Sequence, residues 1–153
     1  MRPIQIRIAV AISLGWLVAQ GCSKDSTGPD SAPCTAETGS VTATVTVGTS
    51  VRFDWTPRCS VAMVLVEEDA SDRWLVSSPE DSWTSADAAN KILPPLTYGQ
   101  TPAGTEIGEP PATLVAGRTY ELILWRMLPS GSTAQCQQRF ENMCLLTVTE
   151  FTR

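Results

Sequence analysis

The chain has 153 residues, of which 42% are apolar and 18% are charged, which is the composition of a single folded globular domain. Its 11 basic and 16 acidic residues give a net charge of −5, and an acidic surface repels the phosphates of nucleic acids. We therefore expect no nucleic acid partner. The sequence contains no histidine, which removes the most frequent general base and metal ligand. We expect neither an enzyme nor a cofactor.

The first 21 residues have the layout of an export signal. Met1 to Arg7 is short and basic, Ile8 to Val18 is a run of eleven uncharged residues, and small residues follow it directly. A transmembrane helix needs about 20 apolar residues, so this run is too short to be a permanent membrane span. We expect residues 1–21 to be a signal peptide.

The segment Leu17 to Cys22, LVAQGC, resembles the lipobox of bacterial lipoproteins. The resemblance implies a diacylglyceryl group on the Cys22 thiol, cleavage before Cys22, and a further acyl chain such as palmitate on the new amino terminus. Two or three acyl chains hold a protein stably on a membrane, so the membrane is an expected partner. The alternative is an ordinary secretory signal followed by an incidental cysteine.

Residues 22–33 are predicted to be the acylated cysteine and a flexible tether. Ser23 to Pro33 is polar and rich in turn-forming residues, and a flexible chain of this length reaches roughly 18 Å. The resemblance also implies that Ser23, directly after the cysteine, is compatible with transport to an outer membrane. We expect a protein of the cell envelope, with the outer membrane favoured and the domain on its periplasmic or surface face.

Four cysteines remain after Cys22, namely Cys34, Cys59, Cys136 and Cys144. An even number of cysteines in an exported chain predicts two disulfides, for which three connectivities are open. A zinc site made of four thiolates is the alternative, but the sequence lacks the closely spaced cysteine pair that is typical of such sites.

The remainder, residues 34–153, is rich in short strand patterns. Val41 to Val47 alternates between apolar residues and threonine, and Val51 to Trp55 alternates again after a turn, which predicts a hairpin. Val61 to Val66 is a continuous apolar run that predicts a central strand buried on both faces. Lys91 to Pro111 contains five prolines, so we expect an edge strand or an extended crossing there.

Three further strands are predicted over Arg73–Val76, Thr119–Met127 and Leu145–Phe151, with room for one helical turn within Ser77 to Asn90. Seven short strands without an amphipathic helix predict an all-β fold, a single antiparallel β-sandwich.

Two segments of this region resemble fibronectin type III domains. Leu114 to Leu124, LVAGRTYELIL, is similar to the L-x-P-G-T-x-Y-x-V-x-V run of that family, and Val51 to Pro57, VRFDWTP, resembles its second strand. The resemblance implies that Tyr120 bonds back to the backbone at a corner and that Trp55 fills the core. An immunoglobulin-like sandwich is the related alternative, and the proline-rich stretch departs from the family.

The topology implied by this resemblance brings the four cysteines to one pole of the sandwich. It favours a bridge between Cys136 and Cys144 as a loop clamp, and a second between Cys34 and Cys59, although pairing across them stays geometrically open. The tether would leave from the same pole.

Three aromatic residues are candidates for ligand binding. Trp74 and Trp83 lie outside the strongest strand patterns, and Tyr98 lies between prolines; exposed rings offer stacking faces for sugars or partner side chains. The alternative is that the tryptophans cap the core and that Tyr98 anchors a loop.

Four carboxylates fall within six residues, at Glu67, Glu68, Asp69 and Asp72. They supply enough oxygen for a calcium ion, but they lack the spacing of a calcium-binding loop. We expect a solvated turn between strands and keep the metal site only as a weak candidate.

These features together predict a lipid-anchored envelope protein that acts as a non-catalytic binding or structural module. The expected partner is an envelope protein or a glycan. The alternatives are a carbohydrate or small-ligand binder that uses the exposed aromatics, and a calcium-stabilised adhesion domain.

Overall fold

The computed structural model describes residues 32–35, 38, 40–132, 136–140 and 142–153. The predicted signal peptide, Cys22 and nearly all of the tether lie outside the described residues. No helix among the described residues is long and apolar enough to cross a bilayer.

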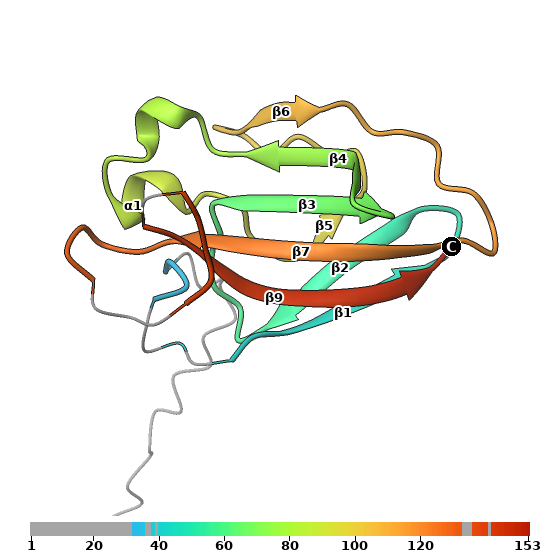
Figure 1. Cartoon of the computed structure of the whole chain (residues 1–153), viewed down its shortest axis with the longest axis horizontal. Coiled ribbons are helices and arrows are strands. Elements are labelled where there is room, and N and C mark those ends of the chain that lie inside the picture. Colours follow the sequence, from blue (N-terminus) through green and yellow to red (C-terminus); the bar gives the residue numbers. More distant parts are fainter. Residues whose placement is uncertain (1–31, 36–37, 39, 133–135, 141) are drawn as a thin grey trace, which may run out of the picture.

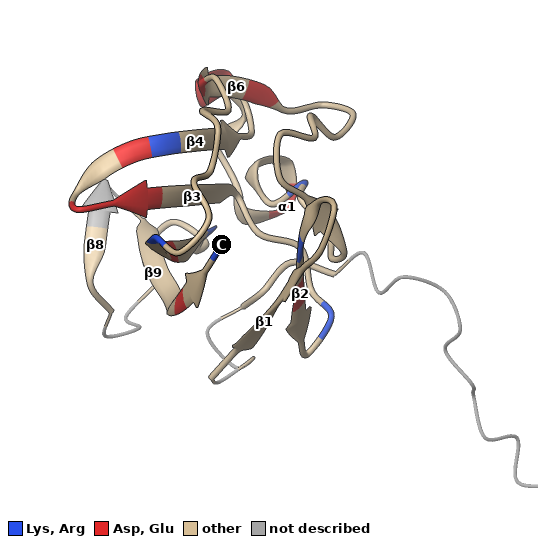
Figure 2. Cartoon of the chain, turned by 90° about the vertical axis from the view of Figure 1, so that its right-hand side faces the viewer, with Lys and Arg blue, Asp and Glu red and all other residues tan. Residues whose placement is uncertain are grey.

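Two antiparallel sheets pack face to face (Figures 1 and 2). The first has the order β1-β2-β5, with β1 Thr42–Val47, β2 Val51–Thr56 and β5 Leu96–Thr97. The second has the order β6-β4-β3-β7-β9-β8, and its strands are β3 Met63–Glu68, β4 Ser71–Ser77, β6 Glu106–Glu109, β7 Thr119–Met127, β8 Gln138–Phe140 and β9 Met143–Thr152. The predicted all-β sandwich is confirmed.

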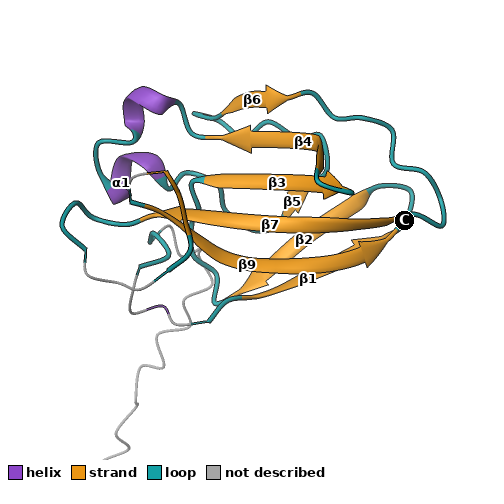
Figure 3. Ribbon diagram, viewed as in Figure 1, coloured by secondary structure: helices purple, strands orange, loops and turns teal. Residues whose placement is uncertain are grey.

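Two single-turn helices lie between β4 and β5. They are the 3-10 helix η2, Glu80–Ser82, and α1, Ala86–Ala89. The turn η2 sits beside the end of β4 and the beginning of β6, and α1 packs against β7 (Figure 3). Ser85 caps α1 by accepting a hydrogen bond from the backbone of Ala88. The segment that was expected to have room for one helical turn therefore holds two.

The hairpin of β1 and β2 follows directly from the alternation of its residues. Val45 lies opposite Phe53, and Ala43 lies opposite Trp55. Phe53 and Trp55 are buried, while the alternate residues Thr42, Thr44 and Thr46 are exposed. A period of two with one buried face therefore fixes both the strand pairing and its register.

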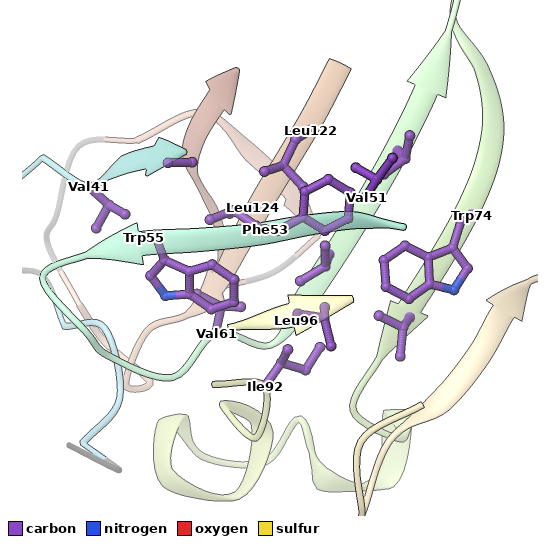
Figure 4. Packing of buried hydrophobic residues seen from close by; sticks show 14 of the residues in the cluster. Val41, Val51, Phe53, Trp55, Val61, Trp74, Ile92, Leu96, Leu122 and Leu124 are labelled. Carbon is purple, nitrogen blue, oxygen red and sulfur yellow. The ribbon is translucent and has the colours of Figure 1, made fainter. Parts of the chain in front are cut away.

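The main core lies between the two sheets (Figure 4). Phe53 of β2 packs against Trp74 of β4 and Phe151 of β9, with ring centroids 6.2 Å and 5.8 Å apart. Leu122 and Leu124 of β7 complete this contact from the second sheet. Fully burying one such side chain is worth about 1.5–3 kcal/mol, so this layer supplies most of the driving force that holds the sheets together.

A second cluster of buried residues covers the outward side of the six-stranded sheet. We call it the outer cluster; its members are Ala62, Met63, Leu65, Ala89, Ile123, Trp125, Met127 and Met143. Along β3, Val64 and Val66 belong to the main core, whereas Met63 and Leu65 belong to the outer cluster. The continuous apolar run of β3 is thus explained by burial on both faces.

The two disulfides join Cys34 to Cys59 and Cys136 to Cys144, as favoured from the sequence, with Cα atoms 4.9 Å and 5.6 Å apart. By restricting the unfolded chain, the two bridges stabilise the fold by about 3.5 and 2.5 kcal/mol respectively. Arg126 lies opposite Cys144 in the β7–β9 register and donates a hydrogen bond from Nη1 to the backbone oxygen of Thr35. Both bridges therefore lie at the same end of the sandwich.

The described residues form nine strands rather than the seven expected. The proline-rich stretch holds two short strands in different sheets, β5 in the first and β6 at the edge of the second. The strand β8 was missed because three residues are too few to show a periodic pattern. The prediction that Glu67 and Glu68 lie in the turn is also corrected, since both belong to β3. The turn is at Asp69 and Ala70, which both have positive φ, as a tight hairpin requires.

Candidate functional site

Trp83 follows η2 and lies half-buried against the outer cluster. Its Nε1–H lies 3.1 Å from both the backbone oxygen and the hydroxyl oxygen of Ser78, and donates to them. The loop that carries it is closed by a hydrogen bond from the Ser82 hydroxyl to the backbone oxygen of Pro79, at 2.6 Å. Because the polar edge of the indole is already bonded, the ring orientation is fixed and its carbon surface is what remains for contacts.

Beside Trp83 lies an open cleft of about 250 Å³. It is lined by residues of β3, β4, the η2 loop and β6, namely Met63, Leu75, Ser77, Ser78, Glu80, Trp83, Glu106, Ile107 and Gly108. The cleft therefore combines an apolar floor with hydroxyl and carboxylate groups at its rim, which is the usual composition of a small binding site.

The strand β6 forms one wall of this cleft. It pairs with β4 through Ser77 opposite Glu106 and Val76 opposite Ile107, and all four of its residues are exposed. Ile107 is 42% exposed, so its side chain is available for contacts at the cleft. A Cβ at Gly108 would lie 2.6 Å from Cδ2 of Leu75, so only glycine lets β6 approach the Leu75 side chain this closely.

The charge at the cleft is uniformly negative. Glu80 and Glu106 are exposed at its rim, and the residues that line it include no lysine or arginine. At the far end of the same sheet, Glu67, Glu121 and Glu150 lie opposite one another across β3, β7 and β9. Acidic residues colour parts of β3, β4, β6 and β9 red in Figure 2. The outward face of the six-stranded sheet is thus acidic at both ends.

The predicted solvated acidic turn needs a correction at Glu68. This side chain is only 7% exposed, and its carboxylate pairs with Arg73 Nη2 at 2.7 Å and with Arg118 Nε at 3.0 Å. Glu68 therefore ties β4 to the residue that directly precedes β7.

Asp69 and Asp72 are exposed, as expected of a turn. Among the described residues, no group of three or more cysteine, aspartate and glutamate side chains is arranged to hold a metal ion. Glu67 and Asp69 line a shallow hollow of about 220 Å³ together with Glu121 and Glu150.

Trp74 belongs to the core and is withdrawn as a ligand-binding candidate. It is 0% exposed and lies between the rings of Phe53 and Tyr98, with the Tyr98 centroid 5.2 Å away. Trp83, by contrast, lines a cleft.

Tyr98 anchors a crossing between the sheets. Its hydroxyl lies 2.8 Å from the backbone oxygens of Arg73 and Ala112 and donates to them. Burial raises the pKa of Tyr98 to about 12. The ring also lines a hollow of about 310 Å³ with Val51, Leu114 and other residues, but its polar atom is already used, so we place it in the framework of the fold.

Trp55 and Tyr120, which the resemblance assigned to structure, are both buried. Trp55 Nε1 donates to the backbone oxygen of Cys59 at 2.8 Å, next to the first disulfide. The Tyr120 hydroxyl accepts a hydrogen bond from the backbone N–H of Val115 at 2.8 Å, five residues upstream. Each residue therefore closes a local turn of the chain with its single polar group.

Most of the cleft could not be found from sequence. Glu80, Glu106, Ile107 and Gly108 lie in segments with no strong pattern, and they meet Trp83 only because β6 returns to the edge of β4. The signal that was available is the isolated isoleucine at 107, an aliphatic side chain flanked by glycine and glutamate within a proline-rich stretch.

No family model, no curated protein and no solved structure is significantly similar to this chain.

Proposed function

We propose that this protein is a lipid-anchored binding module of a bacterial cell envelope and that it has no catalytic activity. The observation that carries the proposal is the pairing of the cysteines. Four of the five form two disulfides, which are typical of exported proteins, and Cys22, the fifth, is the one at the end of the lipobox-like segment. Ser23 favours the outer membrane, on its periplasmic or surface side.

For the fold type, we propose a fibronectin type III-like or immunoglobulin-like sandwich. The orders β1-β2-β5 and β3-β7-β9 agree with the A-B-E and C-F-G neighbours of immunoglobulin-type domains. The hydrogen bond between Tyr120 and Val115 has the form of the tyrosine corner of such domains. Because this architecture hosts many unrelated functions, the function is argued from the cleft beside Trp83.

The anchor is tested by expressing the full chain in a lipoprotein-processing bacterium that is fed a clickable fatty acid. We expect the wild type to incorporate the label and to fractionate with membranes. Cys22→Ser should lack the label and accumulate as precursor, whereas Ser26→Ala in the tether should behave as the wild type. Normal processing and membrane retention of Cys22→Ser would refute the anchor. Cross-linking in intact cells would then identify the envelope protein or glycan that the module contacts.

Carbohydrate binding is a second candidate function, and the half-buried ring of Trp83 favours it. An indole face at an open cleft, next to the groups of Ser77 and Glu80, is a suitable platform for a sugar ring. Titration of envelope glycans against the wild type and Trp83→Ala tests this candidate. Saturable binding that the substitution abolishes would support it.

A further inference from the structure

The side chains that line the cleft beside Trp83 offer more hydrogen-bond acceptors than free donors. The Nε1–H of Trp83 is bonded to Ser78, and the Ser78 hydroxyl lies 3.4 Å from the backbone oxygen of Ala62, within hydrogen-bonding reach. The remaining side-chain polar groups of the lining are the carboxylates of Glu80 and Glu106 and the hydroxyl of Ser77. Ionised carboxylates only accept hydrogen bonds. A ligand that matches this lining therefore carries several donors and a positive charge.

The apolar part of the cleft adds a second requirement. Leu75, Ile107 and the carbon surface of Trp83 form its floor and walls, and an aromatic face attracts a cation held within about 6 Å of it. The side chains of lysine and arginine have both properties, because an aliphatic stem carries a charged head that only donates. A neutral sugar, which presents as many acceptors as donors, fits this lining less well.

The cleft is also accessible to an extended chain. β6 is the edge strand of its sheet, and three of its four exposed residues line the cleft. The whole chain carries a net charge of −5, which steers cationic partners toward the surface.

We propose that the cleft binds a lysine or arginine side chain of a basic, extended segment of a partner protein. The aliphatic stem packs on Trp83 and Ile107, and the charged head pairs with Glu80 and Glu106. This inference deepens the proposed binding function and rests on it for the choice of the cleft, but it does not depend on the lipid anchor, which the labelling experiment decides separately.

The test uses the full chain, purified in detergent and labelled with ¹⁵N, and follows amide and indole resonances by NMR. The probe is an acetylated and amidated heptapeptide of alternating threonine and lysine, and its matched control has glutamine in place of lysine. We expect the lysine peptide, and not the glutamine peptide, to shift the Trp83 indole N–H and the Ile107 amide. The Trp83 signal is assigned by its loss in Trp83→Phe.

Two double variants with the same change of charge separate the cleft from general acidity. Glu80→Gln with Glu106→Gln should weaken the lysine peptide about fivefold, the effect expected for exposed charge pairs. Glu121→Gln with Glu150→Gln, at the far end of the same sheet face, should leave the affinity within about twofold. Near-UV circular dichroism checks that both variants are folded.

Three results would overturn the proposal. The first is an absence of Trp83 and Ile107 shifts with the lysine peptide. The second is an equal loss of affinity in the two double variants, which would show that the attraction is diffuse. The third is saturable binding of a neutral glycan at Trp83 that survives Glu80→Gln with Glu106→Gln, which would assign the cleft to carbohydrate.

Discussion

The outward faces of the two sheets differ in kind. The three-stranded sheet presents Thr42, Thr44 and Thr46 of β1 to solvent, next to Arg52 and Asp54 of β2, which carry one charge of each sign. The outward face of the six-stranded sheet is instead apolar around the outer cluster and acidic at both ends. The polar, charge-balanced face is an ordinary solvated surface. On the other face the outer cluster is already buried, so it is the open cleft beside Trp83 and its unbalanced negative charge that suit this face to binding.

The largest expected effect in this comparison comes from the pair of variants Leu65→Ala and Thr44→Ala. Both residues point outward from their sheets, but Leu65 is fully buried in the outer cluster and Thr44 is exposed. Leu65→Ala should lower the free energy of unfolding by about 3 kcal/mol through lost burial and a new cavity, and Thr44→Ala by no more than about 0.5 kcal/mol. Urea denaturation measures both, and similar losses would contradict the distinction between the faces.

The second test concerns the acidic end of the six-stranded sheet. Glu68→Ala should destabilise the fold by about 2 kcal/mol, because it leaves Arg73 and Arg118 without their shared carboxylate. Glu121→Ala is the matched control on β7, where a glutamate faces other glutamates; relief of repulsion should make it neutral or slightly stabilising. A neutral Glu68→Ala would show that this ion-pair cluster carries little stability. Thermal unfolding at low salt gives the comparison.

A third prediction addresses the joint between the two sheets. Tyr98→Phe removes the hydroxyl that bonds the backbones of Arg73 and Ala112, at a cost of about 1 kcal/mol at neutral pH. The folded pKa of about 12 exceeds the ordinary value of 10.0, so the contribution of this tyrosine is complete below pH 10 and is lost as pH rises toward 12. The free energy of unfolding, measured across that range, should fall more steeply with pH for the wild type than for Tyr98→Phe. Parallel curves would contradict the raised pKa.

The fourth prediction concerns Gly108→Ala, at the wall of the cleft. The new Cβ would meet the end of the Leu75 side chain, which must move toward the cleft at a cost of about 1 kcal/mol. The affinity for the lysine peptide should nevertheless fall, because Leu75 then occupies space needed by the ligand. Thr46→Ala, on the opposite face, should leave both quantities unchanged. Full affinity in Gly108→Ala would place the ligand elsewhere.

Much of the framework could be predicted from local sequence. The alternation of Val41 to Val47 and of Val51 to Trp55 was enough for the β1–β2 hairpin, because a period of two with one buried face is a local property. The apolar run of β3 and the strands β7 and β9 were equally visible. The even number of cysteines after Cys22 predicted two bridges, and the resemblance to fibronectin type III domains favoured the pairing that the structure shows.

The cleft, the burial of Glu68 and the role of Trp74 were decided by tertiary structure alone. Trp74 and Trp83 looked alike in sequence, but β4 points Trp74 between the sheets while the η2 loop leaves Trp83 at the rim. Glu68 is buried in the fold because Arg118, fifty residues away in the sequence, pairs with its carboxylate. Such outcomes depend on which distant strands become neighbours, and pairing across long loops leaves no periodic trace in the chain.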